Sequence, residues 1–362
     1  MIETKYWLAA GVESGLQEAA AALAAGGVVA FPTETVYGLG ADARNTEAVA
    51  RIFAAKGRPS DNPLIVHLAS EEALEAVASE VNDMERRLIR AFWPGPLTLV
   101  LPVRPGAVSP LVTAGLDTVA VRVPAHEIAR RLIEQSGCPL AAPSANRSGR
   151  PSPTEAAHAM EDLTGRIDGV LDGGSAGIGL ESTVVRIVDG AIHILRPGGV
   201  TCEQLRFAAG ADARIVSPVA EGEPGGDGGA GAILDEAARP RSPGVKYKHY
   251  APQGAMLLIV GDDPQRIVAG VLAAAAEARR TGRKVGIIAS SEHADRYSAD
   301  AVLVCGSRQA PAEAAHRLYA VLRECDRLGL DRIVAEGFPE TGIGAALMNR
   351  MRKAAGGQVR RV

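Results

Sequence analysis

Four side chains able to bind phosphate fall within one seven-residue stretch, 56–62, which reads KGRPSDN. Arginine binds phosphate bidentately and lysine binds it as a point charge, while hydroxyl and amide groups add hydrogen bonds. One glycine and two prolines in or just after the stretch rule out a helix through it. We therefore expect an exposed or cleft-lining turn suited to a polyphosphate; a solvated basic loop is the alternative. Its binding groups are Lys56, Arg58, Ser60 and Asn62.

A second polar loop, 143–152, reads PSANRSGRPS. Small residues let the backbone approach a ligand, and the hydroxyls and cations could bind phosphate. An ordinary Ser/Gly surface loop is the alternative. The polar members of this loop are Ser144, Asn146, Arg147, Ser148, Arg150 and Ser152.

Arg122 lies in an otherwise apolar run, 117–124, whose alternation puts Thr118, Ala120 and Arg122 on one face. A buried arginine is costly unless an anion meets it, so Arg122 is a candidate for binding a carboxylate.

Another polar group stands where a short apolar run, 28–31, gives way to PTETVYGLG. Its members are Thr33, Glu34, Thr35 and Tyr37. Ligand groups gather at strand ends in α/β proteins, although a Thr/Val-rich strand with a turn would look the same.

Amphipathic spacing and strong helix formers predict helices in the first 200 residues, and short β-branched runs predict strands. We expect helices at 15–26, 46–56, 71–92 and 126–136, with another starting at Pro153. We expect strands at 28–31, 64–68, 97–101, 117–124, 140–142, 181–188 and, as the last of this region, 192–196.

From residue 256, strands and helices alternate, which predicts a small parallel α/β sheet. The expected strands are 256–260, 284–289, 301–304 and 332–336, and the helices are 264–280, 311–328 and 343–355. No GxGxxG pattern follows the first of these strands, so we predict no dinucleotide site there.

Length and composition limit what the chain can be. Its 362 residues suit two domains, and 47% hydrophobic and 22% charged residues are typical of a soluble globular protein. The net charge of -3 and the 4% aromatic content do not indicate a nucleic-acid partner. Four cysteines without a CxxC pair indicate a reduced cytoplasmic protein without a zinc site. We see no signal peptide and no membrane-spanning run.

The stretch 220–231 reads AEGEPGGDGGAG, which is typical of a linker. We therefore expect a first domain at 1–210, a linker at 211–255 and a second domain at 256–362. The linker includes SPGVKYKHYAP at 242–252, where two tyrosines, two lysines and a histidine suit a contact, or alternatively a solvated patch.

Seven of these motifs, in order, resemble the threonylcarbamoyl-AMP synthase family in its longer, two-domain Sua form. They are FPTETVYGLG at 31–40, KGRPSDNPLIVH at 56–67, the strand with Arg122, PSANRSG at 143–149, STV at 182–184, LRPG at 195–198 and SPGVKYKHYAP at 242–252. Where the linker commonly has methionine, this chain has Val245. The C-terminal region fits by position and pattern, with less motif support.

The resemblance implies a YrdC-like twisted α/β domain with a large positive cavity, followed by a small Rossmann-like parallel α/β domain. It implies that L-threonine, bicarbonate (or CO2) and ATP give L-threonylcarbamoyladenylate and pyrophosphate, a nucleotidyltransferase reaction. The product would feed N6-threonylcarbamoyladenosine formation at position 37 of tRNAs reading ANN codons, through a downstream tRNA threonylcarbamoyltransferase. Mg2+ would arrive with ATP, since no carboxylate cluster is available for it.

The resemblance also distributes roles among residues, with Lys56 and Arg58 as the catalytic pair. His67 belongs to the set, although a lone histidine near a strand end is more often packed than a ligand. The linker motif would form a lid that keeps water from the adenylate. The implied ATP-binding residues are Lys56, Arg58, Ser60, Asn62, Thr118, Ser144, Asn146, Ser152, Arg196, Tyr247 and Tyr250. The implied threonine-binding residues are Thr35, His67, Arg122, Ala142 (through its backbone) and Ser182.

Two other functions fit parts of the pattern. A tRNA or double-stranded RNA-binding module would use the same cavity charges, but the hydroxyl-rich loops speak against it. A carbamoyl-transferring maturation factor would carry zinc-binding segments, and this chain has no CxxC pair to match them. The sequence leaves open the second domain's role, the oligomeric state, direct tRNA binding and movement of the lid.

Overall fold

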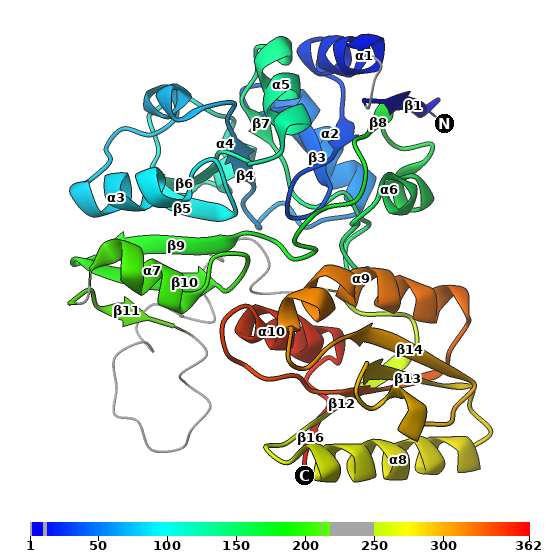
Figure 1. The fold of residues 1–362 in the computed structure, drawn as a ribbon. Coiled ribbons are helices and arrows are strands. Elements are labelled where there is room, and N and C mark those ends of the chain that lie inside the picture. The colour runs from blue at the N-terminus through cyan, green and yellow to red at the C-terminus, as the bar shows by residue number, and fades with distance from the viewer. Residues whose placement is uncertain (1, 10–12, 211, 218–249) are drawn as a thin grey trace. The chain divides into compact units, whose positions relative to one another are not determined.

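The computed structural model describes residues 2–9, 13–210, 212–217 and 250–362 (Figure 1). Its chain divides into two compact units that do not coincide with two continuous stretches of sequence. Among the described residues, the first unit comprises 2–148, 155–177 and 181–217, less the gaps. The second comprises 149–154, 178–180 and 250–362.

The first unit is built on an eleven-stranded mixed sheet, in the order β1-β8-β2-β3-β7-β4-β6-β5-β9-β10-β11. Most of its strands are short and buried, as a sheet covered by helices requires. The strands are β1 Lys5–Leu8, β2 Val29–Phe31, β3 Gly38–Asp42, β4 Ile65–His67, β5 Leu97–Pro102, β6 Thr118–Arg122, β7 Leu140–Ala141, β8 Gly169–Asp172, β9 Thr183–Val188, β10 Ala191–Arg196 and β11 Ile215–Val216.

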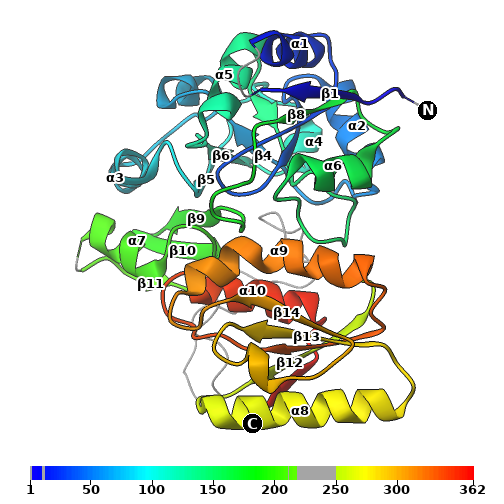
Figure 2. The same cartoon turned by 45° about the vertical axis from the view of Figure 1, so that its right-hand side comes forward.

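Helices cover this sheet, and helix and strand residues together form its two main apolar clusters. Helices α1 and α5 lie side by side (Figures 1 and 2). Leu16 of α1 and Leu132 of α5 belong to the same apolar cluster. Ile52 and Leu88 belong to the larger cluster. The helices are α1 Glu13–Ala24, α2 Thr46–Lys56, the 3-10 helix η1 Glu71–Ala76, α3 Asp83–Phe92, α4 Pro110–Thr113, α5 Glu127–Ser136, α6 Ala156–Leu163 and α7 Cys202–Ala209.

The second unit contains a five-stranded, all-parallel sheet in the order β14-β13-β15-β12-β16. Helix α8 covers one face of it, and α9 and α10 cover the other (Figures 1 and 2). The parallel α/β fold expected here is confirmed. Its elements are β12 Ala255–Val260, α8 Pro264–Arg280, β13 Val285–Ser290, the 3-10 helix η3 Ala294–Arg296, β14 Ala301–Gly306, α9 Pro311–Arg327, β15 Arg332–Glu336, α10 Gly344–Ala354 and β16 Val359–Arg361.

Two short segments that precede residue 200 also belong to the second unit, and both lie against α9. The Arg323 guanidinium donates a hydrogen bond of 2.6 Å to the Pro151 carbonyl. A Cβ added at Gly179, whose φ is +79°, would meet the His316 carbonyl oxygen at 2.5 Å. The Ala251 N–H donates to the Gly149 carbonyl at 2.9 Å. Helix α9 is therefore closely packed by both segments.

Several sequence expectations were wrong in detail. The single helix expected at 71–92 is two helices, because Asn82 and Glu85 form a reciprocal capping box that starts α3 afresh. The helix expected from Pro153 begins at Ala156. The strand ending at Arg196 is not the last of its sheet, since β11 pairs with β10.

No helix within the described residues is long and apolar enough to cross a membrane.

Candidate active site

The 56–62 turn begins where helix α2 ends. Gly57 terminates the helix with a φ of 63°, in the left-handed region that glycine adopts without strain. The Arg58 N–H then donates to the Phe53 carbonyl at 3.0 Å. This cap puts Lys56 on the last helical turn and turns Arg58 away from the helix direction, into the loop before β4.

Lys56 joins this turn to the second polar loop. Its ammonium group is buried and donates hydrogen bonds to the backbone carbonyls of Ser144 and Asn146, the latter at 2.5 Å. The Ser148 N–H donates back to the Lys56 carbonyl at 2.9 Å. Burial, together with the charge of Arg58, lowers the pKa of Lys56 well below its ordinary value. The resemblance assigned both loops to ATP, and the structure joins them directly through Lys56.

The other residues of the turn differ in burial. Asn62 is 1% exposed, and neither its Oδ1 nor its Nδ2 has a hydrogen-bond partner in the described part of the chain. Arg58 is half-buried and donates to the Pro63 carbonyl at 3.2 Å, whereas Ser60 is exposed. Buried amides are rarely left unpaired, so Asn62 has the character of a ligand-binding group.

The buried guanidinium of Arg122 forms the centre of a second cluster of polar residues, which we call the Arg122 pocket. It donates to Thr35 Oγ1 at 3.0 Å and forms an ion pair with Glu34 at 3.2 Å. His67 stands opposite Arg122 on the paired strands β4 and β6, and the Ala142 N–H donates to the Ile65 carbonyl at 2.9 Å. Four residues predicted to bind threonine thus lie around two neighbouring strands.

The protonation states in this pocket follow from burial. Burial, then the nearby charge of Arg122, lowers the pKa of His67 to about 3, so its imidazole is neutral at physiological pH. Burial also lowers the pKa of Arg122, opposed by the carboxylate of Glu34. A negatively charged ligand at Arg122 would favour the charged form of the guanidinium.

Arg196 and Ser182 were predicted to bind different substrates, and the structure puts them in direct contact. The Arg196 guanidinium donates to the Ser182 carbonyl at 2.9 Å and to Ser182 Oγ at 3.1 Å. Ser182 Oγ also pairs with Thr98 Oγ1 at 2.7 Å. If the predicted roles hold, the boundary between the ATP and threonine subsites runs through this contact.

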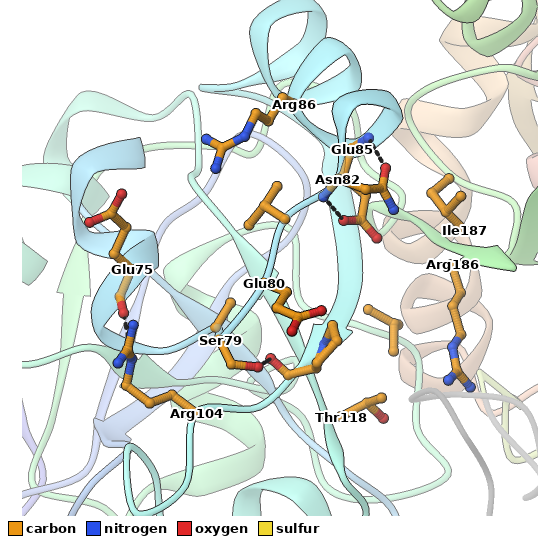
Figure 3. Close-up of a pocket in the computed structure, with 14 residues that line it drawn as sticks. Glu75, Ser79, Glu80, Asn82, Glu85, Arg86, Arg104, Thr118, Arg186 and Ile187 are labelled. Carbon is orange, nitrogen blue, oxygen red and sulfur yellow. Dashed lines mark hydrogen bonds between the residues drawn. The ribbon is translucent and has the colours of Figure 1, made fainter. Parts of the chain in front are cut away.

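Thr118 lines a cavity of about 670 Å³ (Figure 3). Val100 lines it too and packs with Ala120, while Ala120 lies between Thr118 and Arg122 on one face of β6. The cavity and Arg122 therefore lie on the same face of the sheet. Its charge is mixed rather than positive, because its lining contains Glu75, Glu80, Glu85, Arg86, Arg104 and Arg186.

Two predicted ATP-binding residues belong to the second unit. Ser152 is fully buried there. Tyr250 has a φ of 66° and stacks on Tyr319, with the ring centroids 5.3 Å apart, while Arg350 lies over its ring. Tyr247, with most of the predicted lid and linker, lies outside the described residues. The ATP-binding roles of all three remain predictions.

Sequence reasoning passed over two residues of these pockets. Thr98 was taken as part of an apolar strand, although a lone hydroxyl residue in a buried strand is itself a signal. Glu34 was noted without a role, and its pairing with Arg122 could not be anticipated. Among the described residues, no group of three or more His, Cys, Asp and Glu side chains is placed to hold a metal ion.

A mixed α/β unit with buried polar clusters and a small parallel α/β unit agree with the two-domain architecture that the resemblance implied. A family model described as "Telomere recombination", named for Sua5, YciO and YrdC, matches residues 21–198. One described as "Threonylcarbamoyl-AMP synthase, C-terminal domain" matches residues 200–356. The chain therefore belongs to the threonylcarbamoyl-AMP synthase family, in its longer form, which confirms the resemblance seen in the motifs.

Relatives from distant organisms support this family assignment. The threonylcarbamoyl-AMP synthase of Bacillus subtilis (strain 168) is 48% identical over 95% of this chain and 94% of its own length. That of Pyrococcus abyssi is 47% identical over 93% of each chain. A shorter putative threonylcarbamoyl-AMP synthase of Mycobacterium tuberculosis (strain H37Rv) is 40% identical over 55% of this chain and 91% of its own.

The whole fold also has a close counterpart among solved structures. The crystal structure of P. abyssi Sua5 complexed with L-threonine covers 99% of both chains, with a TM-score of 0.87 and 44% sequence identity. Both units of the present chain are thus represented in one solved relative.

Proposed function

We propose that this protein is a threonylcarbamoyl-AMP synthase, which converts L-threonine, bicarbonate and ATP into L-threonylcarbamoyladenylate and pyrophosphate. Relatives that match nearly the full chain carry this name, and one of them was solved with L-threonine bound. The observation in the site itself that carries the proposal is the set of buried polar atoms without partners among the described residues. They include both amide atoms of Asn62 and Nε of Arg122.

In the proposed reaction, the threonine amine and bicarbonate form a carbamate. A carbamate oxygen then attacks the α-phosphorus of ATP, and pyrophosphate leaves, which makes the enzyme a nucleotidyltransferase. Little covalent chemistry falls to the protein, which must align the reactants and neutralise charge. Arg122 would bind the threonine carboxylate, because a buried guanidinium with a free Nε–H suits a carboxylate oxygen.

The nucleotide would lie along the same face of the sheet. A cavity of about 670 Å³ has room for a nucleoside, and Thr118 would contact it there. Lys56, Arg58 and Asn62 would hold the phosphates. An arriving triphosphate would raise the pKa of Lys56 back toward its ordinary value, so binding and charging of that side chain would support each other. Mg2+ would come bound to ATP.

The product would supply the threonylcarbamoyl group for N6-threonylcarbamoyladenosine in tRNA, through a separate transferase. The test of the proposal is direct. Purified protein with ATP, L-threonine and labelled bicarbonate should release pyrophosphate only when all three are present, and the labelled carbon should appear in an adenylate. Release of pyrophosphate without threonine would contradict the proposal.

A further inference from the structure

Glu34 contributes a carboxylate to the Arg122 pocket, from the loop between β2 and β3. Its Oε2 lies 3.2 Å from Arg122 Nη2, and the two side chains are 14% and 2% exposed. The neighbouring Thr35 holds the other terminal nitrogen of the same guanidinium at 3.0 Å. Thr33 Oγ1 in turn donates to the Val36 carbonyl at 2.6 Å, which fixes the loop that carries Glu34 and Thr35.

Only one oxygen of this carboxylate is used. Oε1 of Glu34 is buried and has no hydrogen-bond partner among the described residues, and the same is true of Nε of Arg122 and Nδ1 of His126. A carboxylate present only to balance a buried arginine would be expected to satisfy both oxygens, because an unpaired buried oxygen costs free energy. The unused oxygen therefore points to a donor that arrives with a ligand.

The other titratable groups around Glu34 are poorly suited to accept a proton. Burial lowers the pKa of His126, against the opposing charges of Glu34 and Glu127. Burial and Arg122 lower the pKa of His67 to about 3. Arg122 is a cation. Among the groups described in this pocket, Glu34 is thus the group that could receive a proton.

We propose that Glu34 receives the amino group of threonine, with Oε1 accepting its N–H groups and taking the proton that is lost as the carbamate forms. This rests on the proposed function. Threonine enters as a zwitterion, and Arg122 meets only its carboxylate, so its ammonium needs a separate acceptor. Glu34 lies on the loop next to Thr35 and supplies that acceptor beside the carboxylate site.

The proton balance requires such a group. The threonine ammonium and bicarbonate give the carbamate, one water and one proton: a nitrogen–carbon bond forms, a carbon–oxygen bond breaks, and the oxygen leaves as water. An ammonium has no lone pair, so one N–H proton must leave before nitrogen can attack. Glu34 takes that proton on Oε1 and becomes a neutral carboxylic acid, which returns the proton to solvent after the product leaves.

The first test measures recognition of the threonine amine separately from recognition of its carboxylate. Binding of L-threonine and of (3R)-3-hydroxybutyrate, which lacks the amine, is measured on the wild type and on Glu34→Gln, by calorimetry or by competition. We expect E34Q to weaken threonine binding at least tenfold and to leave the hydroxybutyrate affinity within twofold. Equal losses for both ligands would mean that Glu34 only holds Arg122, and would overturn the proposal.

The second test is kinetic. We expect E34Q to lower kcat/KM for threonine by 100-fold or more, in the range of general base catalysis, with KM for ATP within twofold. We also expect the wild-type rate to fall toward acidic pH and the rate of E34Q not to follow that fall. Glu13→Gln, which removes a carboxylate paired with Arg131 on the surface, is the matched control and should behave as the wild type.

The remaining outcomes are also decisive. Threonine binding and turnover within twofold of the wild type in E34Q would overturn the proposal. If E34Q does not fold, Glu34→Asp is used instead, because it keeps the charge on a shorter side chain. We expect this variant to retain the pH dependence of the wild type at a reduced rate. An unaltered rate would overturn the proposal. If the wild type makes no adenylate, the proposed function fails, while the comparison of the two ligands still decides the role of Glu34.

Discussion

His67 and Arg122 face each other across the paired strands β4 and β6, and both side chains are buried. The folded protein therefore keeps His67 neutral, with its pKa lowered to about 3 by burial and by Arg122. Unfolding would return the imidazole to a pKa near 6.5, so the unfolded chain binds a proton that the folded chain does not. Stability supplied by the neutral imidazole is present above about pH 6.5 and falls as the pH drops toward 3.

The first prediction follows from this fall of stability with falling pH. The free energy of unfolding of His67→Asn should fall less steeply between pH 6.5 and 4 than that of the wild type, by up to about 1.4 kcal/mol per pH unit. Urea unfolding at several pH values measures the slopes. A comparison at pH 8, where histidine is neutral in both states, separates the cost of lost packing. Equal slopes would contradict the role assigned to His67.

Arg122 should matter for threonine and not for ATP. We expect Arg122→Met to raise the KM for threonine by about 10- to 100-fold, the range for loss of a hydrogen bond to a charged group, while the Kd for ATP stays within twofold. It should also destabilise the protein, because it leaves the Glu34 carboxylate buried without its cation. The double variant E34Q/R122M should recover much of that stability in thermal melts. Loss of ATP binding in R122M would show that the roles are reversed.

Lys56 and Arg58 are expected to differ although they share one motif. Lys56→Met should lose activity at least 100-fold and also lower stability by about 1–3 kcal/mol, because the Ser144 and Asn146 carbonyls lose a buried donor. Arg58→Ala should lose similar activity with little change in Tm, because Arg58 is only half-buried. Activity assays and melts on both variants make the comparison. Wild-type rates in both would remove the phosphate-binding assignment.

Substitutions at Gly57 test the cost of an unfavourable backbone conformation, because a new side chain there would have room. A Cβ there would meet nothing within 4 Å, but the φ of +63° is unfavourable for other residues. We expect Gly57→Ala to cost about 1–2 kcal/mol and Gly57→Asn to cost less, as measured by urea unfolding. Gly177→Ala is the control, since its Cβ would meet only the Glu34 carbonyl oxygen, at 3.8 Å, without a positive φ. Equal costs at the two sites would refute the conformational explanation.

The sequence predicted the second unit better than the first. Helix α8 and strand β15 match their expected bounds, because long amphipathic helices alternating with apolar strands have a strong period. In the first unit the short strands β1, β8 and β11 carry little periodic signal and were not predicted. The break between η1 and α3 could have been found, since Asn82 and Glu85 have the spacing of a capping box.

The motifs proposed residues for the candidate site, but they did not predict the contacts between those residues. The motifs supplied Lys56, Asn62 and Arg122, because each is an unusual residue type for its place. The pairing of Arg122 with Glu34 joins residues 88 positions apart, and no local rule fixes such a pairing. The burial of Lys56 against two carbonyls was equally invisible, because a lysine beside an arginine and a proline normally suggests exposure.

Two segments of the second unit come from the first 200 residues of the chain, and this limits how the chain can be shortened. Its segments 149–154 and 178–180 lie against α9, where Arg323 and His316 meet them. Cutting the chain near residue 247 would leave these two segments without the helix that they pack on. The shorter Mycobacterium tuberculosis relative is matched over 199 residues. A truncated form of the present protein would therefore not be equivalent to that shorter natural relative unless both segments were redesigned for exposure to water.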